Sequence, residues 1–247
     1  MKAIILCAGY ATRLYPLTEN MPKALLPVKG KPILDYLIEK VNEVREVDSI
    51  YIISNSRFYN NFSEWLSKKQ ENYRDKIKIV DSGSDSVDDQ KGPINDCLIA
   101  INKFGIDDDV LFLYGDNLFS LDMKKFIDFS KEKSSTCLAC YELSDIKDAS
   151  KFGIANVAEN NKITDMEEKP QQPRSNLAVT GIYLIRKEDI SKLKEFYEKS
   201  KAEGRLKPGF GLTYFVIELI KKQEVYAFSF SGEWLDIGSK EDYEKVK

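Results

Sequence analysis

Residues 3–14 read AIILCAGYATRL, which is a short apolar run, a loop of small residues and then Arg13. The apolar run predicts a buried strand. The small residues after it let backbone N–H groups approach a phosphate, and Arg13 can add a bidentate charged contact. Three prolines then stiffen an extended segment that holds Lys23. The loop has one Gly and fits neither the dinucleotide-binding nor the Walker pattern, so these residues alone leave a phosphate loop and a tight structural loop equally open.

Outward from this stretch, short apolar or β-branched runs alternate with longer segments of helical periodicity. In this first part the expected strands are 3–6, 49–53, 77–80 and 110–114, and the expected helices begin at 31–32 or cover 58–69, 93–104 and 123–133. Such alternation indicates an α/β fold of Rossmann-like type, with a mixed, mostly parallel sheet and helices on both faces.

The alternation of strands and helices ends near residue 135, and mostly strands follow. The expected elements there are strands at 135–141, 153–158, 162–168 and 177–184, then a helix at 212–222, a strand at 225–230, a loop at 234–236 and a short charged helix. These strands add a mixed portion to the sheet of the first half. Because no flexible linker separates the two portions, we predict a single domain over residues 1–247.

Composition excludes several classes of function. The 37 Lys and Arg against 40 Asp and Glu leave a net charge of -3, which creates no field to gather nucleic acid or an anionic membrane. No apolar run reaches membrane-spanning length and no signal segment is evident, so we expect a cytoplasmic protein with small-molecule partners. The chain has no His, which excludes Ser-His-Asp and Cys-His nucleophiles and His-based zinc sites. Cys137 and Cys140 form a C-x-x-C in a strand, which directs them to opposite faces, so we expect buried thiols rather than a redox pair.

Ligands of open α/β sheets bind beyond the carboxyl ends of the strands. Asp116 follows the expected strand 110–114 and therefore lies where a ligand would bind. Residues 107–109 are three aspartates that contain the Asp-x-Asp pattern of many metal-binding glycosyltransferases, but they precede that strand and lie at its other end. The acidic run 81–89 lacks the Gly and the Glu that a calcium-binding EF-hand loop requires. We interpret this run as a solvated loop near the mouth of the site.

Six further motifs follow each other along the chain. The run 6–14 is followed by Pro16-Leu17-Thr18 and by PKALLPV at 22–28, then by GDN at 115–117, EEKP at 167–170, TGIY at 180–183 and WLDIG at 234–238. In this order they resemble the signature of sugar-1-phosphate nucleotidylyltransferases, of the kind that includes glucose-1-phosphate thymidylyltransferases and uridylyltransferases. The resemblance covers nearly the whole chain. It implies the nucleotide-diphospho-sugar transferase fold, with a nucleotide-binding half at 1–135 and a sugar-phosphate-binding half at 136–247.

The resemblance also implies an activity and a set of site residues. A nucleoside monophosphate would pass from a nucleoside triphosphate to a sugar 1-phosphate with release of pyrophosphate, and glucose 1-phosphate with dTTP or UTP is the favoured pair. Mg²⁺ is the implied cofactor, and a homo-oligomer is compatible with the family. The implied residues are Arg13 and Lys23 for catalysis; Ala8, Gly9, Tyr10, Ala11, Thr12, Gln90 and Gly92 for the nucleotide; Gly153, Glu168, Lys169, Thr180 and Gly181 for the sugar phosphate; and Asp116 and Asp236 for the metal.

The absence of His agrees with such a reaction. A sugar phosphate has its second pKa near ~6, so its oxygen is already a nucleophile at neutral pH and needs no general base. The remaining task is to position the groups and to neutralise the charge that gathers at the α-phosphorus. Mg²⁺ usually takes one or two protein carboxylates together with phosphate oxygens, and two aspartates supply that number.

Two departures from the family pattern leave the base open. Ala11 stands where the commonest loop carries Gly, and Tyr10 is bulkier than the usual residue. The run 90–96 lacks the Gly-Leu of members that select thymidine or uridine. Three alternatives therefore accompany the main hypothesis: a nucleotidyltransferase for another base or a non-sugar phosphate, such as a CTP-dependent one; a glycosyltransferase that uses residues 107–109; and a non-catalytic regulatory subunit that binds nucleotide or sugar.

Overall fold

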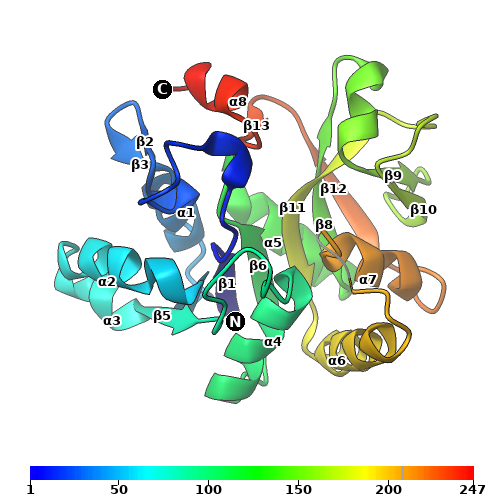
Figure 1. The fold of residues 1–247 in the computed structure, drawn as a ribbon. Coiled ribbons are helices and arrows are strands. Elements are labelled where there is room, and N and C mark those ends of the chain that lie inside the picture. Colours follow the sequence, from blue (N-terminus) through cyan, green and yellow to red (C-terminus); the bar gives the residue numbers. More distant parts are fainter. Residues whose placement is uncertain (207–208) are drawn as a thin grey trace.

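A computed structural model describes residues 1–206 and 209–247 of the chain. Its centre is a nine-stranded sheet whose main path runs β10-β9-β11-β6-β1-β4-β5 (Figure 1). The first half of the chain supplies the parallel strands β1 (Lys2–Leu6), β4 (Ser49–Ser54), β5 (Ile77–Asp81) and β6 (Val110–Tyr114). These strands form because runs of buried Ile, Leu and Val alternate between the two faces of the sheet.

The second half of the chain completes the sheet in mixed orientation. Strand β11 pairs antiparallel with β6, β8 and β9, and β12 pairs parallel with β8. The bounds are β8 Cys137–Glu142, β9 Gly153–Val157, β10 Ile163–Glu168, β11 Leu177–Ile185 and β12 Tyr226–Phe230. The predicted α/β fold with a mixed sheet is therefore confirmed, and parallel pairing dominates its N-terminal half.

Helices cover both faces of the sheet, as predicted. Helices α1 (Ile33–Asn42), α2 (Tyr59–Ser67) and α5 (Met123–Lys133) share one apolar core with Ala3 and Ile5 of β1. Helices α4 (Pro93–Phe104), α6 (Lys187–Ala202) and α7 (Leu212–Leu219) share the other core with Ile4 and Leu6. Cys137 lies in the first core and Cys140 in the second, which confirms that the C-x-x-C sulfurs point to opposite faces.

Several short elements complete the chain. They are the helices α3 (Glu71–Lys76) and α8 (Lys240–Glu244), the 3-10 turns Thr12–Leu14, Lys23–Leu25, Ser56–Phe58 and Ile146–Lys151, and the strand pairs β2 (Pro27–Val28) with β3 (Lys31–Pro32) and β7 (Asn117–Phe119) with β13 (Trp234–Asp236). The segment 234–236, expected as a loop, is thus a strand. Residues 31–32 form β3, and the expected helix begins after them at Ile33.

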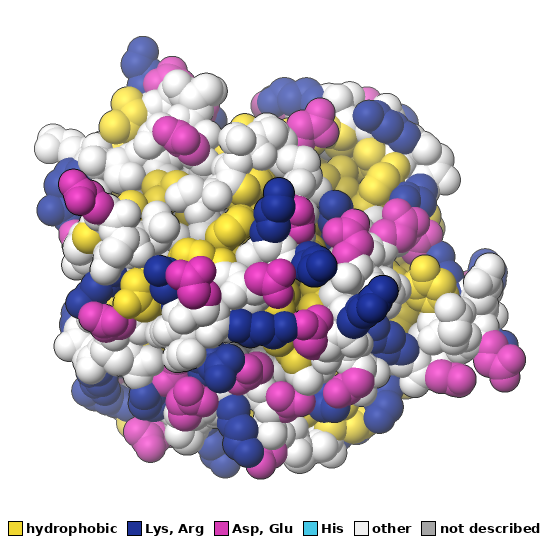
Figure 2. All heavy atoms as spheres, turned by 180° about the vertical axis from the view of Figure 1, so that it is seen from behind, with side chains coloured by type: hydrophobic (Ala, Val, Ile, Leu, Met, Phe, Trp, Pro, Cys, Tyr) yellow, Lys and Arg dark blue, Asp and Glu magenta, His cyan; other side chains and the backbone are white. Residues whose placement is uncertain are grey.

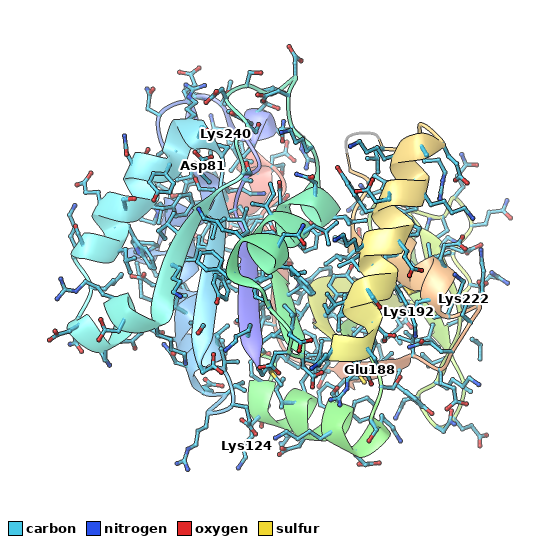
Figure 3. The ribbon with its side chains drawn as sticks, turned by 90° about the horizontal axis from the view of Figure 1, so that it is seen from below. Asp81, Lys124, Glu188, Lys192, Lys222 and Lys240 are labelled. Carbon is cyan, nitrogen blue, oxygen red and sulfur yellow. The ribbon has the colours of Figure 1, made fainter. Side chains whose placement is uncertain are left out.

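Helix α6 has no counterpart among the expected elements, although it spans 16 residues. Figure 3 shows it beside the sheet, with Glu188 and Lys192 on it. On the face seen in Figure 2, Lys and Arg side chains are interspersed with Asp and Glu rather than gathered by sign. Within residues 1–206 and 209–247, every helix is too short or too polar to cross a bilayer.

Candidate nucleotide and sugar-phosphate site

The loop after β1 is held in shape by hydrogen bonds to its backbone. Asn55 Nδ2 donates to the carbonyl of Ala8 at 3.0 Å, and Thr18 Oγ1 donates to the carbonyl of Ala11 at 2.8 Å. Ala11 has φ 48° and ψ 45°, in the left-handed region that favours Gly. This conformation gives a physical reason for the Gly that the family pattern carries here. The 3-10 turn Thr12–Leu14 starts directly after Ala11 and directs Arg13.

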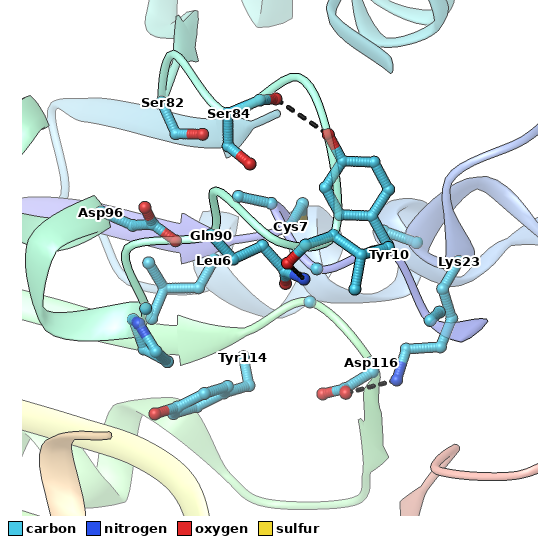
Figure 4. Close-up of a pocket in the computed structure, with 18 of the residues that line it drawn as sticks. Leu6, Cys7, Tyr10, Lys23, Ser82, Ser84, Gln90, Asp96, Tyr114 and Asp116 are labelled. Atoms are coloured by element: carbon cyan, nitrogen blue, oxygen red, sulfur yellow. Dashed lines mark hydrogen bonds and ion pairs between the residues drawn. The ribbon is translucent and has the colours of Figure 1, made fainter. Parts of the chain in front are cut away.

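A cavity of about 460 Å³ opens beside this loop, at the carboxyl ends of β1 and β6 (Figure 4). It lies where the topological argument places a ligand. Ten of the implied residues line it: Ala8, Gly9, Tyr10, Ala11, Thr12, Arg13, Lys23, Gln90, Gly92 and Asp116. The segment that follows β5 also lines it through Ser82, Ser84 and Val87, so part of the run 81–89 lies beside the cavity, although none of its aspartates line it.

Tyr10 contributes to the cavity in a way that its implied role did not anticipate. Its ring is only 2% exposed and lies 6.2 Å, centroid to centroid, from that of Phe58. Its hydroxyl donates to the carbonyl of Ser84 at 2.9 Å. Tyr10 therefore ties the segment after β5 to the loop after β1, and its backbone rather than its ring is available to a nucleotide.

Lys23 and Asp116 meet at one end of the cavity. Lys23 Nζ lies 2.6 Å from Asp116 Oδ2 and also donates to the carbonyl of Ile237 at 2.9 Å. Asn117 Nδ2 donates to Asp116 Oδ1 at 2.8 Å, and Trp234 Nε1 donates to Asn117 Oδ1 at 2.8 Å. Both carboxylate oxygens of Asp116 are thereby fixed in direction.

Asp236 is brought to Asp116 by the pairing of β13 with β7. Asp236 stands opposite Asn117 in this ladder, and the N–H of Ile237 donates to the carbonyl of Asp116 at 3.0 Å. Burial, followed by the nearby charge of Asp116, raises the pKa of Asp236 to about 6, although Lys23 and Arg13 act in the opposite direction. Two carboxylates that repel each other near one end of the cavity suit a divalent cation. Asp236 does not itself line the cavity.

The implied sugar-phosphate residues lie on the second half of the sheet. Glu168 ends β10 beside Thr213, and burial raises the pKa of its carboxyl. A Cβ on Gly153 would lie 3.0 Å from Thr213 Cγ2 and 3.1 Å from Glu168 Oε2, so Gly keeps this corner open. Lys169 is exposed and has φ 50°, an uncommon backbone conformation that is concentrated at functional sites.

Thr180 and Gly181 shape the site rather than line the cavity. Thr180 is buried and its hydroxyl donates to the carbonyl of Ala139 at 2.8 Å. Gly181 has φ 77°, and a Cβ there would lie 2.8 Å from Tyr114 Cδ2. Tyr114 is the link between the two groups, because its ring contacts Gly181 and also lines the cavity. Gly153, Glu168 and Lys169 are likewise absent from the lining of the cavity as the described residues define it.

The implied site residues leave out several side chains of this region, among them Ser82, Asp96, Tyr114 and Thr213. Tyr114 directly precedes the Gly115-Asp116 motif, which was an available signal. Asp96 stands in the first turn of a helix that begins at Pro93, after a strand and a loop, which was a weaker one. Ser82 and Thr213 carry no local signal, because only the fold brings them to the site.

The three aspartates 107–109 lie at the opposite end of the sheet. Asp108 is 2.7 Å from the N-terminal ammonium group, and Asp109 is 2.7 Å from Arg186. Strand β6 begins directly after these aspartates, and its first residue, Val110, pairs with Lys2 at the start of β1. The aspartates therefore lie at the amino ends of both strands. These ion pairs and this position, far from the cavity, argue against a glycosyltransferase that binds metal through residues 107–109.

A model of the family described as nucleotidyl transferase matches residues 2–247. The bifunctional protein GlmU of Methanocaldococcus jannaschii is 34% identical over 238 residues, which cover 96% of this chain and 51% of the relative. A provisionally assigned mannose-1-phosphate guanyltransferase of Sulfolobus acidocaldarius is 30% identical over 249 residues. The match covers 100% of this chain and 62% of the relative. The chain therefore spans about half to two thirds of the length of these relatives.

Among solved structures, a provisionally assigned glucose-1-phosphate thymidylyltransferase from Bacillus anthracis, in complex with a sucrose, superposes with a TM-score of 0.83. The two sequences are 29% identical, and the match covers 100% of this chain and 93% of the other. This agreement extends from the loop after β1 to the C-terminal helix and confirms the predicted type of fold.

Proposed function

The chain belongs to the nucleotidyl transferase family, and we propose that it transfers a nucleoside monophosphate from a nucleoside triphosphate to a sugar 1-phosphate, releasing pyrophosphate. One observation carries the proposal: Arg13, Lys23 and Asp116 converge on a cavity at the carboxyl ends of β1 and β6. Cations and a fixed carboxylate beside a loop of small residues are what a triphosphate and its metal require. We propose that one protein domain binds both substrates and that the protein acts in the cytoplasm.

Within this class we place glucose 1-phosphate with dTTP or UTP first. The support is the solved structure at 29% identity, whose provisional assignment is a glucose-1-phosphate thymidylyltransferase. The relative from Sulfolobus acidocaldarius carries a guanyltransferase assignment, so GTP stands next.

Positioning and charge do most of the work in this mechanism. The phosphate oxygen of the sugar 1-phosphate attacks the α-phosphorus in line, the bond to the bridging oxygen of pyrophosphate breaks, and no proton needs to be removed at neutral pH. Arg13 neutralises the departing pyrophosphate, and Lys23 stabilises the negative charge that gathers in the transition state. Lys23 is already fixed near that position by Asp116 and the carbonyl of Ile237.

Asp116 and Asp236 would hold Mg²⁺. When bound, the ion would supply charge neutralisation and in-line orientation of the phosphates. The chain contributes the orientation of the carboxylates, because Asn117 fixes one oxygen of Asp116 and β13 fixes the backbone of Asp236. Burial and the charge of Asp116 raise the pKa of Asp236 despite Lys23 and Arg13, and a bound cation would offset both effects.

The sugar 1-phosphate would bind across the second half of the sheet. We assign its phosphate to Lys169 and a sugar hydroxyl to Glu168, with the backbone at Gly153, Thr180 and Gly181 along the ring. The half-buried Glu168 beside Thr213 is a suitable acceptor for a hydroxyl, since burial strengthens such a hydrogen bond.

The test is pyrophosphate release measured with Mg²⁺ across ATP, CTP, GTP, UTP and dTTP, each combined with several sugar 1-phosphates. Release that requires both substrates establishes the reaction and identifies the pair. Nucleotide binding without release in any combination would contradict the proposal and favour a regulatory subunit. Release that requires a phosphorylated compound other than a sugar would favour the non-sugar alternative.

A further inference from the structure

Asp96 lines the cavity, but the proposed mechanism assigns it no role. It lies in the first turn of α4 and lines the cavity together with Gln90, Lys91 and Gly92. Its carboxylate has no hydrogen-bond or ion-pair partner among residues 1–206 and 209–247. Asp96 is partly exposed, and its exposed part faces this cavity. An ionised carboxylate only accepts hydrogen bonds, so these oxygens can accept from a donor on a ligand.

The wall around Asp96 shows a second unpaired group. Ser82 lines the same cavity, and its buried hydroxyl oxygen has no partner within the described part of the chain. Burial raises the pKa of Asp96 to about 7, against an opposing effect of Lys91. The free protein therefore holds this end of the cavity polar and unsatisfied at some cost in free energy. A ligand with an N–H donor would remove that cost.

The position of Asp96 decides which part of a nucleotide would reach it. In Figure 4, Asp96 lies across the cavity from Lys23 and Asp116, which mark the phosphate end. Asp116 follows β6 and Ser82 follows β5, and the strand order β6-β1-β4-β5 places them three strand spacings apart. At roughly 4.8 Å per spacing this is about 14 Å, a span that suits a nucleotide from its phosphates to its base. Figure 4 shows Asp96 on the same side of the cavity as Ser82, so we assign Asp96 to the base end.

The five bases differ in what they offer a carboxylate. Uracil, thymine and guanine each have a ring N–H next to a carbonyl, whereas cytosine and adenine have a ring nitrogen acceptor next to an amino group. We propose that Asp96 selects the base by accepting a hydrogen bond from the ring N–H. This favours uracil, thymine and guanine over cytosine and adenine, whose ring nitrogen would face the carboxylate as a second acceptor. This inference rests on the proposed function, because it assigns the base end of the same cavity.

The deciding measurement is the Kd of each of the five nucleoside triphosphates at pH 8.5, where Asp96 is ionised, with Mg²⁺ and without a sugar phosphate, so that no turnover occurs. For the unaltered chain, UTP, dTTP and GTP should bind about 10- to 100-fold more tightly than CTP and ATP, the usual value of a hydrogen bond to a charged group. In Asp96→Asn the amide can donate to the ring nitrogen of cytosine or adenine, so that preference should disappear or invert.

Asp88→Asn is the matched control, because Asp88 is an exposed carboxylate on the segment between β5 and α4. It should keep the preference of the unaltered chain. Equal affinities for all five bases in the unaltered chain, or an equal loss for all five in Asp96→Asn, would overturn the inference while the proposed function stands. A changed preference between UTP and dUTP alone would move Asp96 to the ribose. If no nucleotide binds at all, the proposed function itself fails.

A second readout separates base selection from a purely structural role. The groups that face Asp96 are Lys91, Cys97 and Tyr197, and the pKa values of Cys97 and Tyr197 are raised, mainly by burial. A protonated Asp96 can donate to a ring nitrogen acceptor, so the rejection of CTP and ATP should weaken as the pH falls from 8.5 to 5.5. Asp96→Asn should lose this pH dependence. A pH profile shared by both proteins would overturn the inference.

Discussion

Lys23 combines three relations that few surface lysines have. It pairs with Asp116 at 2.6 Å, donates to the carbonyl of Ile237 at 2.9 Å, and lines the cavity to which we assign the nucleotide. The ion pair fixes the ammonium before a substrate arrives, which reduces the reorganisation needed in the transition state. A side chain held in this way contributes to the rate more than to ground-state binding.

We therefore expect Lys23→Ala to lower kcat about 10²- to 10³-fold while the KM of the sugar phosphate changes little, by analogy with the loss of one preorganised donor. Steady-state kinetics on the pair found in the substrate grid would measure this. Lys124→Ala is a suitable control, since Lys124 is exposed on α5. An unchanged kcat in Lys23→Ala would remove Lys23 from the mechanism.

Asp96 also predicts a pH dependence of stability. Its pKa in the folded protein is about 7, above the ordinary 3.8, so between these values the folded chain keeps a proton that the unfolded chain releases. The stabilisation is complete below the unfolded pKa and is lost as the pH rises through the folded pKa. Asp236 contributes with the same sign, so the comparison with Asp96→Asn isolates the effect of Asp96.

The free energy of unfolding, measured by urea titration at pH 4.5 and pH 7.5, should change differently in the two proteins. Relative to Asp96→Asn, the unaltered chain should lose on the order of 2–4 kcal/mol over this interval. Parallel curves would show that the carboxyl of Asp96 titrates in the folded chain as it does in the unfolded one.

At the level of single residues, sequence could predict the side chains that belong to short ordered motifs. Arg13, Lys23 and Asp116 are of this kind, and all three line the cavity. Ser82 and Asp96 belong to no motif, and their place depends on how the segment between β5 and α4 folds back. That segment is held by the bond from Tyr10 to Ser84, a contact between residues 74 positions apart that no local pattern encodes.

Among the strands and helices, β11 affects the shape of the site through Gly181, which packs against Tyr114. Its pairing with β8 shifts register between Val179 and Ile182, which places Gly181 in an irregular stretch with φ 77°. The ring of Tyr114 fills the space where a Cβ would stand. The strand thus positions the ring that joins the nucleotide cavity to the sugar-phosphate residues.

Gly181→Ala should destabilise the chain by two separable effects. The positive φ costs about 1–2 kcal/mol for any residue with a Cβ, and the clash with Tyr114 adds about 1–3 kcal/mol. Gly204→Ala is the matched control, because Gly204 has φ 65° and no atom of residues 1–206 and 209–247 lies within 4 Å of the added Cβ. Chemical denaturation of both variants should show a larger loss for Gly181→Ala, together with a raised KM for nucleotide. Equal losses would show that Tyr114 moves aside freely.

The elements that sequence did not predict share a physical cause. Helix α6 buries Leu193, Phe196 and Tyr197, but these stand in a segment dense in Lys and Glu that weakens its apolar pattern. Strand β13 has three residues, too few for alternation to be recognised, and it forms only because β7 lies beside it. Long buried strands such as β1 and β6 need no distant partner to be identified, and both were predicted.

At the scale of the whole molecule, the site depends on contacts between residues that are far apart in the sequence. The two bonds of Lys23 connect residues 93 and 214 positions apart. Strand β6 of the first half pairs with β11 of the second, and one apolar core includes Ile4 together with Phe215. Because these contacts join the two halves, we predict that residues 1–247 unfold as one domain, although we assign the nucleotide to the first half and the sugar phosphate to the second.

This prediction can be tested by calorimetry with and without nucleotide. A ligand at 100 times its Kd stabilises the folded chain by about 2.7 kcal/mol, which should raise the Tm of a domain of this size by about 5–10 °C. If the halves form one cooperative unit, a single transition should move as a whole, because the paired strands β6 and β11 transmit the stabilisation. A transition that splits on adding nucleotide and Mg²⁺, with one part unmoved, would show instead that residues 136–247 unfold independently of the nucleotide-binding half.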